Sequence, residues 1–138
     1  MPSTRRARAL VLVAIALLFG SACTPEQVTT FAAQNGVELA PEHAQVISLR
    51  YSGDVEAMIR HRWAGTGQAD RAVRIARCES GLNPHAQNRR SSAYGVLQFL
   101  DSTWRSTGIA KTPDPWLQVE AGYRLWKARG WQPWVCRG

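Results

Sequence analysis

The sequence predicts a mainly α-helical protein with at most a short β element. Residues 68–80 and 119–126 carry apolar residues at the spacing of one helix face. Capping residues or prolines precede several such segments, and glycines follow them. Only residues 94–100 are short and apolar enough for a strand, and a buried helical turn fits them equally well. We therefore expect most of the regular structure to be helical.

The first 22 residues have the three-part pattern of a secretory signal peptide. Arg5, Arg6 and Arg8 form a basic region, residues 10–19 are an unbroken apolar run, and residues 20–22 are small. The apolar run is too short to cross a bilayer as a permanent helix. We therefore expect export by the general secretory route, with residues 1–22 removed.

Cys23 follows the small residues directly. Residues 19–23 resemble a bacterial lipobox, in which the cysteine is lipidated and becomes the new N-terminus, although Gly20 replaces the usual leucine. The alternative is an ordinary signal peptide cleaved near Ala22. We expect an exported protein that is lipid-anchored through Cys23 on the outer face of the cell membrane, or secreted and associated with the cell wall.

The cysteine count favours lipidation. The sequence has three cysteines, and exported proteins form disulfides. Cys78 and Cys136 can pair inside one domain, which leaves Cys23 over. Such a bridge closes a loop of nearly sixty residues and contributes about 4 kcal/mol on the chain-entropy model. A domain of about 85 residues has a thin core, so this link is useful.

Composition indicates an anionic partner other than nucleic acid. The formal net charge is +7, and removal of residues 1–22, which hold three arginines and no acidic residue, leaves +4. The remaining basic residues are scattered, and a mildly basic exported protein suits an anionic envelope polymer. The three histidines lack metal-ligand spacing, so no metal or other cofactor is expected. We also expect a monomer.

Residues 23–52 contain no tryptophan, and we predict that they form an anchor and helical spacer. Thr24 and Pro25 are a helix start, because threonine caps well and proline suits the first helical position. Asn35-Gly36 ends that helix, and Pro41 interrupts the segment.

Residues 53–138 are predicted to be the compact domain, and Asp54 caps its first helix. In the second helix, residues 68–80, the buried face continues at helical spacing to Glu79. Gly81 can end this helix in the left-handed conformation. A carboxylate at a helix C-terminus opposes the dipole by about 0.3–1 kcal/mol. Glu79 is therefore the first candidate for chemistry.

The remaining segments complete the domain. Residues 83–92 are polar and predict a loop, and residues 112–115 predict a turn. Asp101 is predicted to cap a helical turn. Residues 120–128 predict the last amphipathic helix, with Glu120 in its first turn.

Two motifs resemble those of a known family. Residues 79–84 read Glu-Ser-Gly-Leu-Asn-Pro and are followed by Ala86, and residues 93–98 read Ala-Tyr-Gly-Val-Leu-Gln. The pair resembles the soluble lytic transglycosylase domain, which has Glu-Ser-x-x-Asn-Pro-x-Ala and Gly-Ala-x-Gly-Leu-Met-Gln. Residues 78–81 and 130–136 are also similar to the resuscitation-promoting factor domains of actinobacteria.

The resemblance covers about residues 54–138 and implies a small lysozyme-like fold. It implies an enzyme that cuts peptidoglycan between N-acetylmuramic acid and N-acetylglucosamine. It also implies that Glu79 protonates the leaving group and then helps the muramic acid 6-hydroxyl to close a 1,6-anhydro ring. Burial against apolar walls favours the protonated form of a carboxyl group. The family's Ala-Tyr-Asn-Ala-Gly motif is absent, and Tyr123 is the nearest counterpart of its tyrosine.

Substrate is predicted to be bound by polar and aromatic side chains around Glu79. Gln98 interrupts an apolar run, so it is either a cleft residue or a satisfied core amide. Ser80 either hydrogen-bonds the glutamate or caps the helix end. Aromatic rings suit sugar faces and also fill cores. The predicted substrate-binding residues are Ser80, Tyr94, Gln98, Trp104 and Tyr123, with Trp131 and Trp134 as further cleft candidates and Trp63 and Trp126 assigned to the core.

Two alternatives to a lytic transglycosylase stay open. A muramidase or resuscitation-type hydrolase would usually need a second carboxylate. Asp101 and Glu120 are the candidates, but helix capping and the helix dipole explain them better. The other alternative is a non-catalytic envelope lipoprotein that binds peptidoglycan.

Overall fold

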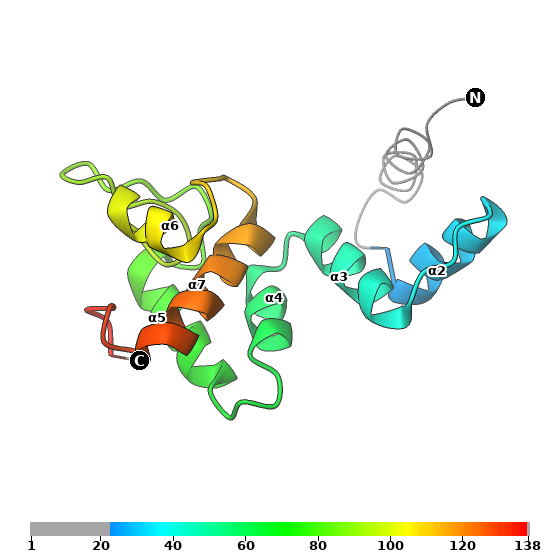
Figure 1. Cartoon of the computed structure of the whole chain (residues 1–138), viewed down its shortest axis with the longest axis horizontal. Coiled ribbons are helices and arrows are strands. Elements are labelled where there is room, and N and C mark those ends of the chain that lie inside the picture. The colour runs from blue at the N-terminus through cyan, green and yellow to red at the C-terminus, as the bar shows by residue number, and fades with distance from the viewer. Residues whose placement is uncertain (1–22, 138) are drawn as a thin grey trace. The chain divides into compact units, whose positions relative to one another are not determined.

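A computed structural model describes residues 23–137, so the predicted signal peptide lies outside the described residues. The chain divides into two compact units, one up to Gly53 and one from Asp54. In the described part helices dominate, as predicted, and the β structure there consists of two isolated bridges (Figure 1). None of the helices in this part is long and apolar enough to cross a membrane.

The N-terminal unit contains α2 (Pro25–Gln34) and α3 (Pro41–Ser52). Thr24 caps α2 as predicted, because its Oγ1 accepts a hydrogen bond from the backbone N–H of Gln27 at 3.3 Å. Pro41 is the first residue of α3, so the proline that interrupts the segment also starts a helix. The unit's small apolar cluster consists of Cys23, Val28 and Ala44, with Phe31, Leu39 and Ile47 packed against them.

The C-terminal unit contains α4 (Val55–Arg62), α5 (Ala69–Ser80), α6 (Asp101–Thr107) and α7 (Pro115–Arg129). Helix α4 packs against α5 and α7, and α6 packs against α7 (Figure 1). The long segment between α5 and α6 has no helix of its own. This arrangement agrees with the predicted small lysozyme-like domain.

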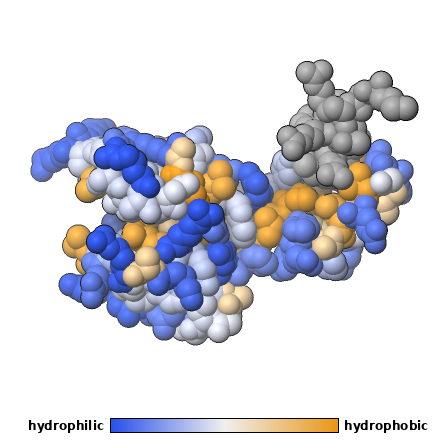
Figure 2. Space-filling view, in the orientation of Figure 1, coloured by the Kyte–Doolittle hydropathy of each residue, from blue (hydrophilic) through white to orange (hydrophobic). Residues whose placement is uncertain are grey.

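The core of the C-terminal unit surrounds a fully buried tryptophan. Trp63 follows α4, and its ring stacks on that of Trp131 at a centroid distance of 6.3 Å. The core prediction is correct for Trp63, whereas Trp126 is half-buried beside it. Hydrophilic residues cover much of the visible face of this unit (Figure 2). Other fully buried side chains are Met58, Ile59, Ile75, Val96 and Val119.

Residues 94–99 form a tight reversal instead of a strand or a helical turn. Tyr94 and Phe99 exchange backbone hydrogen bonds, at 3.1 Å from the Tyr94 N–H and 3.2 Å from the Phe99 N–H. Gly95 has a φ of +85°, a conformation that costs glycine little. An apolar pattern alone cannot show such a reversal. We call residues 94–99 the motif turn.

The last helix begins earlier than predicted, so the first-turn assignment of Glu120 is wrong. Pro115 is the first residue of α7, and Oδ1 of Asp114 accepts hydrogen bonds from the backbone N–H groups of Trp116 and Leu117. Proline and aspartate are typical of turns, which is why residues 112–115 predict one, but both also start helices. Glu120 therefore lies in the middle of the helix, away from its dipole end.

The capping prediction for Asp101 is also wrong. Leu100 occupies the N-cap position of α6, and no side chain there accepts a capping hydrogen bond. Asp101 lies in the first turn, where its Oδ1 pairs with Nζ of Lys111 at 2.9 Å. Ion pairing therefore replaces capping as its role.

Candidate active site

Glu79 lies in the last turn of α5, where the helix presents it from the edge of its buried face. Ala72, Val73, Ile75 and Ala76 make that face, and Gly81 ends the helix with a φ of +65°, as predicted. The Glu79 side chain is half-buried in a pocket of about 240 Å³. The residues lining this Glu79 pocket are Glu79, Leu97, Gln98, Phe99, Leu100, Thr103, Leu125, Pro133, Trp134 and Val135.

The pocket walls are largely apolar and come from distant parts of the chain. Leu97 and Phe99 belong to the motif turn, and Leu125 belongs to α7. Val135 is 90 % exposed, although it is a large apolar residue. A largely apolar pocket with a few polar groups is typical of a binding site.

The C-terminal segment reaches Glu79 through a disulfide. Cys78 and Cys136 are bonded, with Cα atoms 6.1 Å apart, as the cysteine count allows. The backbone N–H of Cys136 donates a hydrogen bond to Oε1 of Glu79 at 3.3 Å. The covalent link at position 78 thus brings a hydrogen-bond donor to the carboxylate at position 79.

The arginines near Glu79 in the sequence point away from it, as expected. Arg74 and Arg77 are exposed, and Arg77 pairs with Glu56 on α4. Hydrogen bonds from Arg60 and Arg77 hold the pKa of Glu56 below its ordinary value. The positive charge of Arg77 is therefore directed to another carboxylate.

Gln98 combines the two roles that the sequence left open. It lines the Glu79 pocket, and its Nε2 donates hydrogen bonds to the backbone oxygens of Ala86 at 3.0 Å and Gly95 at 2.9 Å. Its φ of +51° is rare for a residue with a side chain. Such local strain is common at functional sites, where the surrounding structure maintains it.

Ser80 does not hydrogen-bond Glu79. Its Oγ donates to the backbone oxygen of Val96 at 2.8 Å and to that of Ala76 at 3.3 Å. The first bond joins the end of α5 to the motif turn, so Ser80 connects the two sequence motifs.

Of the five predicted binding residues, only Gln98 lines the Glu79 pocket, and Ser80 and three others do not. Trp104 is 2 % exposed and lines a separate cavity of about 360 Å³ with Asp101 and Lys111. The Tyr94 ring lies 5.5 Å below Nζ of Lys111. The Tyr123 ring lies under the guanidinium of Arg62 at 3.5 Å. The structure therefore does not bring Tyr94, Trp104 and Tyr123 together at Glu79.

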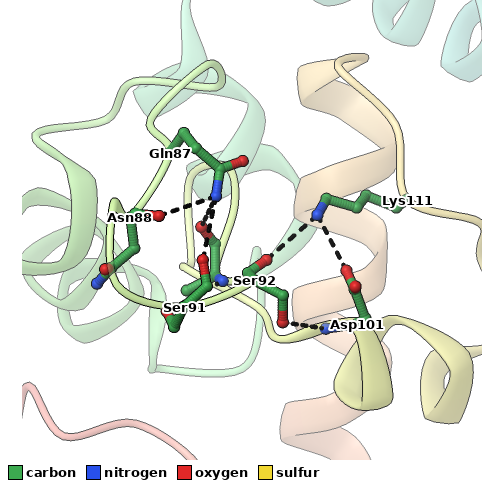
Figure 3. A network of polar contacts seen from close by, with 7 residues as sticks. Gln87, Asn88, Ser91, Ser92, Asp101 and Lys111 are labelled. Atoms are coloured by element: carbon green, nitrogen blue, oxygen red, sulfur yellow. Dashed lines mark hydrogen bonds and ion pairs between the residues drawn. The ribbon is translucent and has the colours of Figure 1, made fainter.

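The loop between the motifs is organised by polar side chains (Figure 3). Nε2 of Gln87 donates to the backbone oxygens of Asn88 and Ala93, both at 3.1 Å. Nζ of Lys111 joins this loop to α6, because it donates to the backbone oxygen of Ser92 at 3.2 Å and pairs with Asp101 (Figure 3). These contacts tie the loop to the start of α6.

Neither candidate for a second carboxylate lines the Glu79 pocket. Asp101 is paired with Lys111, and Glu120 pairs with Arg62 at 2.5 Å and Arg124 at 3.0 Å. Burial raises the pKa of Glu120, but the hydrogen bonds from Arg62 and Arg124 outweigh it and hold that pKa below its ordinary value. Among residues 23–137, Glu79 is the one carboxylate that lines this pocket.

Several residues of the site could not be identified from the sequence. Thr103, Leu125 and Val135 line the pocket, but each looks like an ordinary member of its own segment. Gln118 is fully buried on α7 and carried no signal beyond its being polar within an amphipathic helix. Trp134 lines the pocket as one of the further cleft candidates, whereas Trp131 packs on Trp63 and donates its Nε1–H to Gln68.

Comparison with known proteins identifies the family. Residues 66–137 match the model of the family described as Transglycosylase-like domain. Two curated Staphylococcus aureus proteins, from strains bovine RF122 / ET3-1 and MRSA252, are each named "Probable transglycosylase SceD". Each is 34 % identical to this chain over 112 residues, which cover 70 % of this chain and 48 % of the relative.

The chain thus spans about half the length of the curated relatives that it matches. No solved structure matches the chain. The family model covers more than half of the sequence and includes Glu79, the motif turn and both bonded cysteines. The chain belongs to the transglycosylase-like domain family.

Proposed function

We propose that this protein is an exported peptidoglycan lytic transglycosylase in which Glu79 is the catalytic acid and base. The observation that carries the proposal is a single carboxylate in a largely apolar pocket, with a backbone N–H 3.3 Å from its oxygen. Family membership supports glycan cleavage. The names of the two relatives support transglycosylation.

In the proposed reaction, the protonated Glu79 carboxyl group donates its proton to the oxygen that joins N-acetylmuramic acid to N-acetylglucosamine. The bond from the muramic acid C1 to that oxygen breaks, and positive charge develops at C1. The muramic acid 6-hydroxyl then attacks C1 and passes its proton to the Glu79 carboxylate. A 1,6-anhydro ring forms, and Glu79 regains its proton without a water molecule being consumed.

The pocket combines apolar walls with a hydrogen-bond donor to Glu79. Leu97 and Phe99 are among the apolar groups. The backbone N–H of Cys136 donates to Oε1 of Glu79, and a hydrogen bond of this kind stabilises the carboxylate that cleavage produces. We assign Gln98 and Val135 to substrate binding, because both line the pocket.

The test is product analysis on purified cell wall. Wild-type protein should release fragments with 1,6-anhydro ends, detected by mass spectrometry. Glu79→Gln should reduce turnover by about 10²–10⁴-fold, the usual contribution of general acid–base catalysis. Asp101→Asn is the matched control, because it removes a carboxylate that does not line the Glu79 pocket, and it should keep activity.

Other outcomes identify the alternatives. Reducing ends in place of anhydro ends would assign the protein to the hydrolases. Equal inactivity of wild type and Glu79→Gln, with wall binding retained by both, would assign it to the non-catalytic envelope proteins.

A further inference from the structure

We propose that Gln118 is a positioning residue that holds the two sequence motifs in register around Glu79. The inference rests on the proposed function for its kinetic effect and on geometry alone for its structural effect. Gln118 does not line the Glu79 pocket, so it acts through the residues that it holds.

The Gln118 side chain is 2 % exposed, and its amide uses both N–H donors and its oxygen. Oε1 accepts a hydrogen bond from the backbone N–H of Val96 at 2.7 Å. Nε2 donates to the backbone oxygens of Pro84 at 2.8 Å and Thr112 at 2.9 Å. One amide from α7 thus satisfies backbone groups in three separate segments.

Two of those segments are the motifs. Pro84 ends the motif that begins at Glu79, and Val96 lies in the motif turn. Val96 is held at both of its backbone polar atoms, because its oxygen accepts from Oγ of Ser80. The Gln118 contact therefore fixes the turn that carries Gln98 relative to the helix end that carries Glu79.

Gly95 shows how closely the turn approaches this amide. A Cβ atom at Gly95 would lie 2.5 Å from Oε1 of Gln118, closer than real Cβ contacts occur. A side chain at position 95 is therefore disfavoured twice, by the positive φ and by the space that the amide occupies. The motif turn and Gln118 fit each other as one unit.

Glutamine is the residue type that this position needs. A glutamate of the same shape keeps an acceptor for Val96 but lacks the donors for Pro84 and Thr112. Methionine fills similar volume and makes none of the three bonds. Gln118→Met therefore removes the three hydrogen bonds at similar volume, and Gln118→Glu is the harsher change, because it sets a carboxylate oxygen against the backbone oxygens of Pro84 and Thr112.

The experiment measures both variants in the full chain on short soluble glycan strands, below the melting temperature of each. We expect kcat to fall about tenfold to a hundredfold, as for a small misplacement of reacting groups, with KM within about twofold. Ile59→Val is the control, because it loosens a buried α4 position outside the Glu79 pocket. It should lower the melting temperature and leave kcat unchanged.

A second readout is independent of catalysis. The Val96 amide should exchange slowly with solvent in wild type and fast in Gln118→Met, which lacks an acceptor for it. An inactive wild-type protein would contradict the proposed function. The exchange measurement would still test whether Gln118 holds the motif turn in place.

Three results would overturn the inference. One is a folded Gln118→Met variant with kcat within about twofold of wild type. Another is a loss of kcat that Ile59→Val reproduces at equal loss of melting temperature. The third is failure of both Gln118 variants to fold, because the residue would then serve the fold as a whole.

Discussion

Cys136 contacts two adjacent residues at the end of α5: its sulfur is bonded to Cys78, and its backbone N–H donates to Oε1 of Glu79 at 3.3 Å. The disulfide therefore has a local role besides its effect on chain entropy. It holds residues 133–135 as one wall of the Glu79 pocket.

Removing this bridge should affect both stability and turnover. Cys78→Ser with Cys136→Ser frees a loop with a sequence separation of 58 residues, and the chain-entropy model gives a loss of about 4 kcal/mol in unfolding free energy. Denaturant titration measures that loss, and wall digestion at low temperature measures turnover of the folded fraction. Cys23→Ser is the control, and full activity in the double variant would contradict the wall assignment.

The ion pair between Arg62 and Glu120 should make the free energy of unfolding depend on pH. The pKa of Glu120 is lowered from an ordinary value of 4.5, so the folded state favours the charged form. Its contribution, about 1–2 kcal/mol for hydrogen bonds to a partly buried charge, is present above pH 4.5 and is lost as pH falls through the lowered pKa.

Melting temperatures of wild type and Glu120→Gln, measured between neutral pH and about pH 3, test this prediction. The difference between the two proteins should be constant near neutrality and should shrink below pH 4.5. A difference that stays constant down to the lowest pH would show that the carboxylate charge is not involved.

Gly122→Ala should destabilise the packing of α7 against the motif turn. A Cβ atom there would lie 2.2 Å from Cδ1 of Leu97 and 3.4 Å from the ring of Trp63. Overpacking of this kind costs about 1–3 kcal/mol. Chemical denaturation measures the loss, and Lys127→Ala on the exposed side of α7 serves as control. In a Leu97→Ala background, the same Gly122→Ala change should cost less, because the clashing atom is gone.

Lipidation of Cys23 is tested by fractionation. Cys23→Ala should move the protein from the membrane fraction to the soluble exported fraction. The variant lacks the cysteine that would carry the acyl chains, and those chains are what would hold it to the membrane. A variant that stays with the membrane would contradict the lipobox prediction.

The sequence predicted the position of Glu79 because that position depends on local geometry. The apolar stripe of α5 and the glycine at position 81 are neighbours of the glutamate in the sequence, and helical spacing relates them. The family motifs likewise occupy contiguous residues. Local patterns of this kind survive folding, which explains why the helix and its end were predicted correctly.

The roles of Asp101, Glu120 and Gln118 depend on distant partners. Asp101 pairs with a lysine ten positions away, and Arg62, the partner of Glu120, is 58 positions away. Gln118 contacts Pro84 and Val96, which lie 34 and 22 positions before it. Helix-end rules consider only neighbours, so they assigned local roles to both carboxylates and no role to the glutamine.

The separation of the pocket segments along the chain has a consequence for folding. Glu79 and the C-terminal wall are 57 positions apart, and Leu125 comes from yet another helix. No single helix therefore carries the pocket, which exists only when these segments have come together. The proposed activity requires the completely folded C-terminal unit, and an isolated α5 peptide should have none.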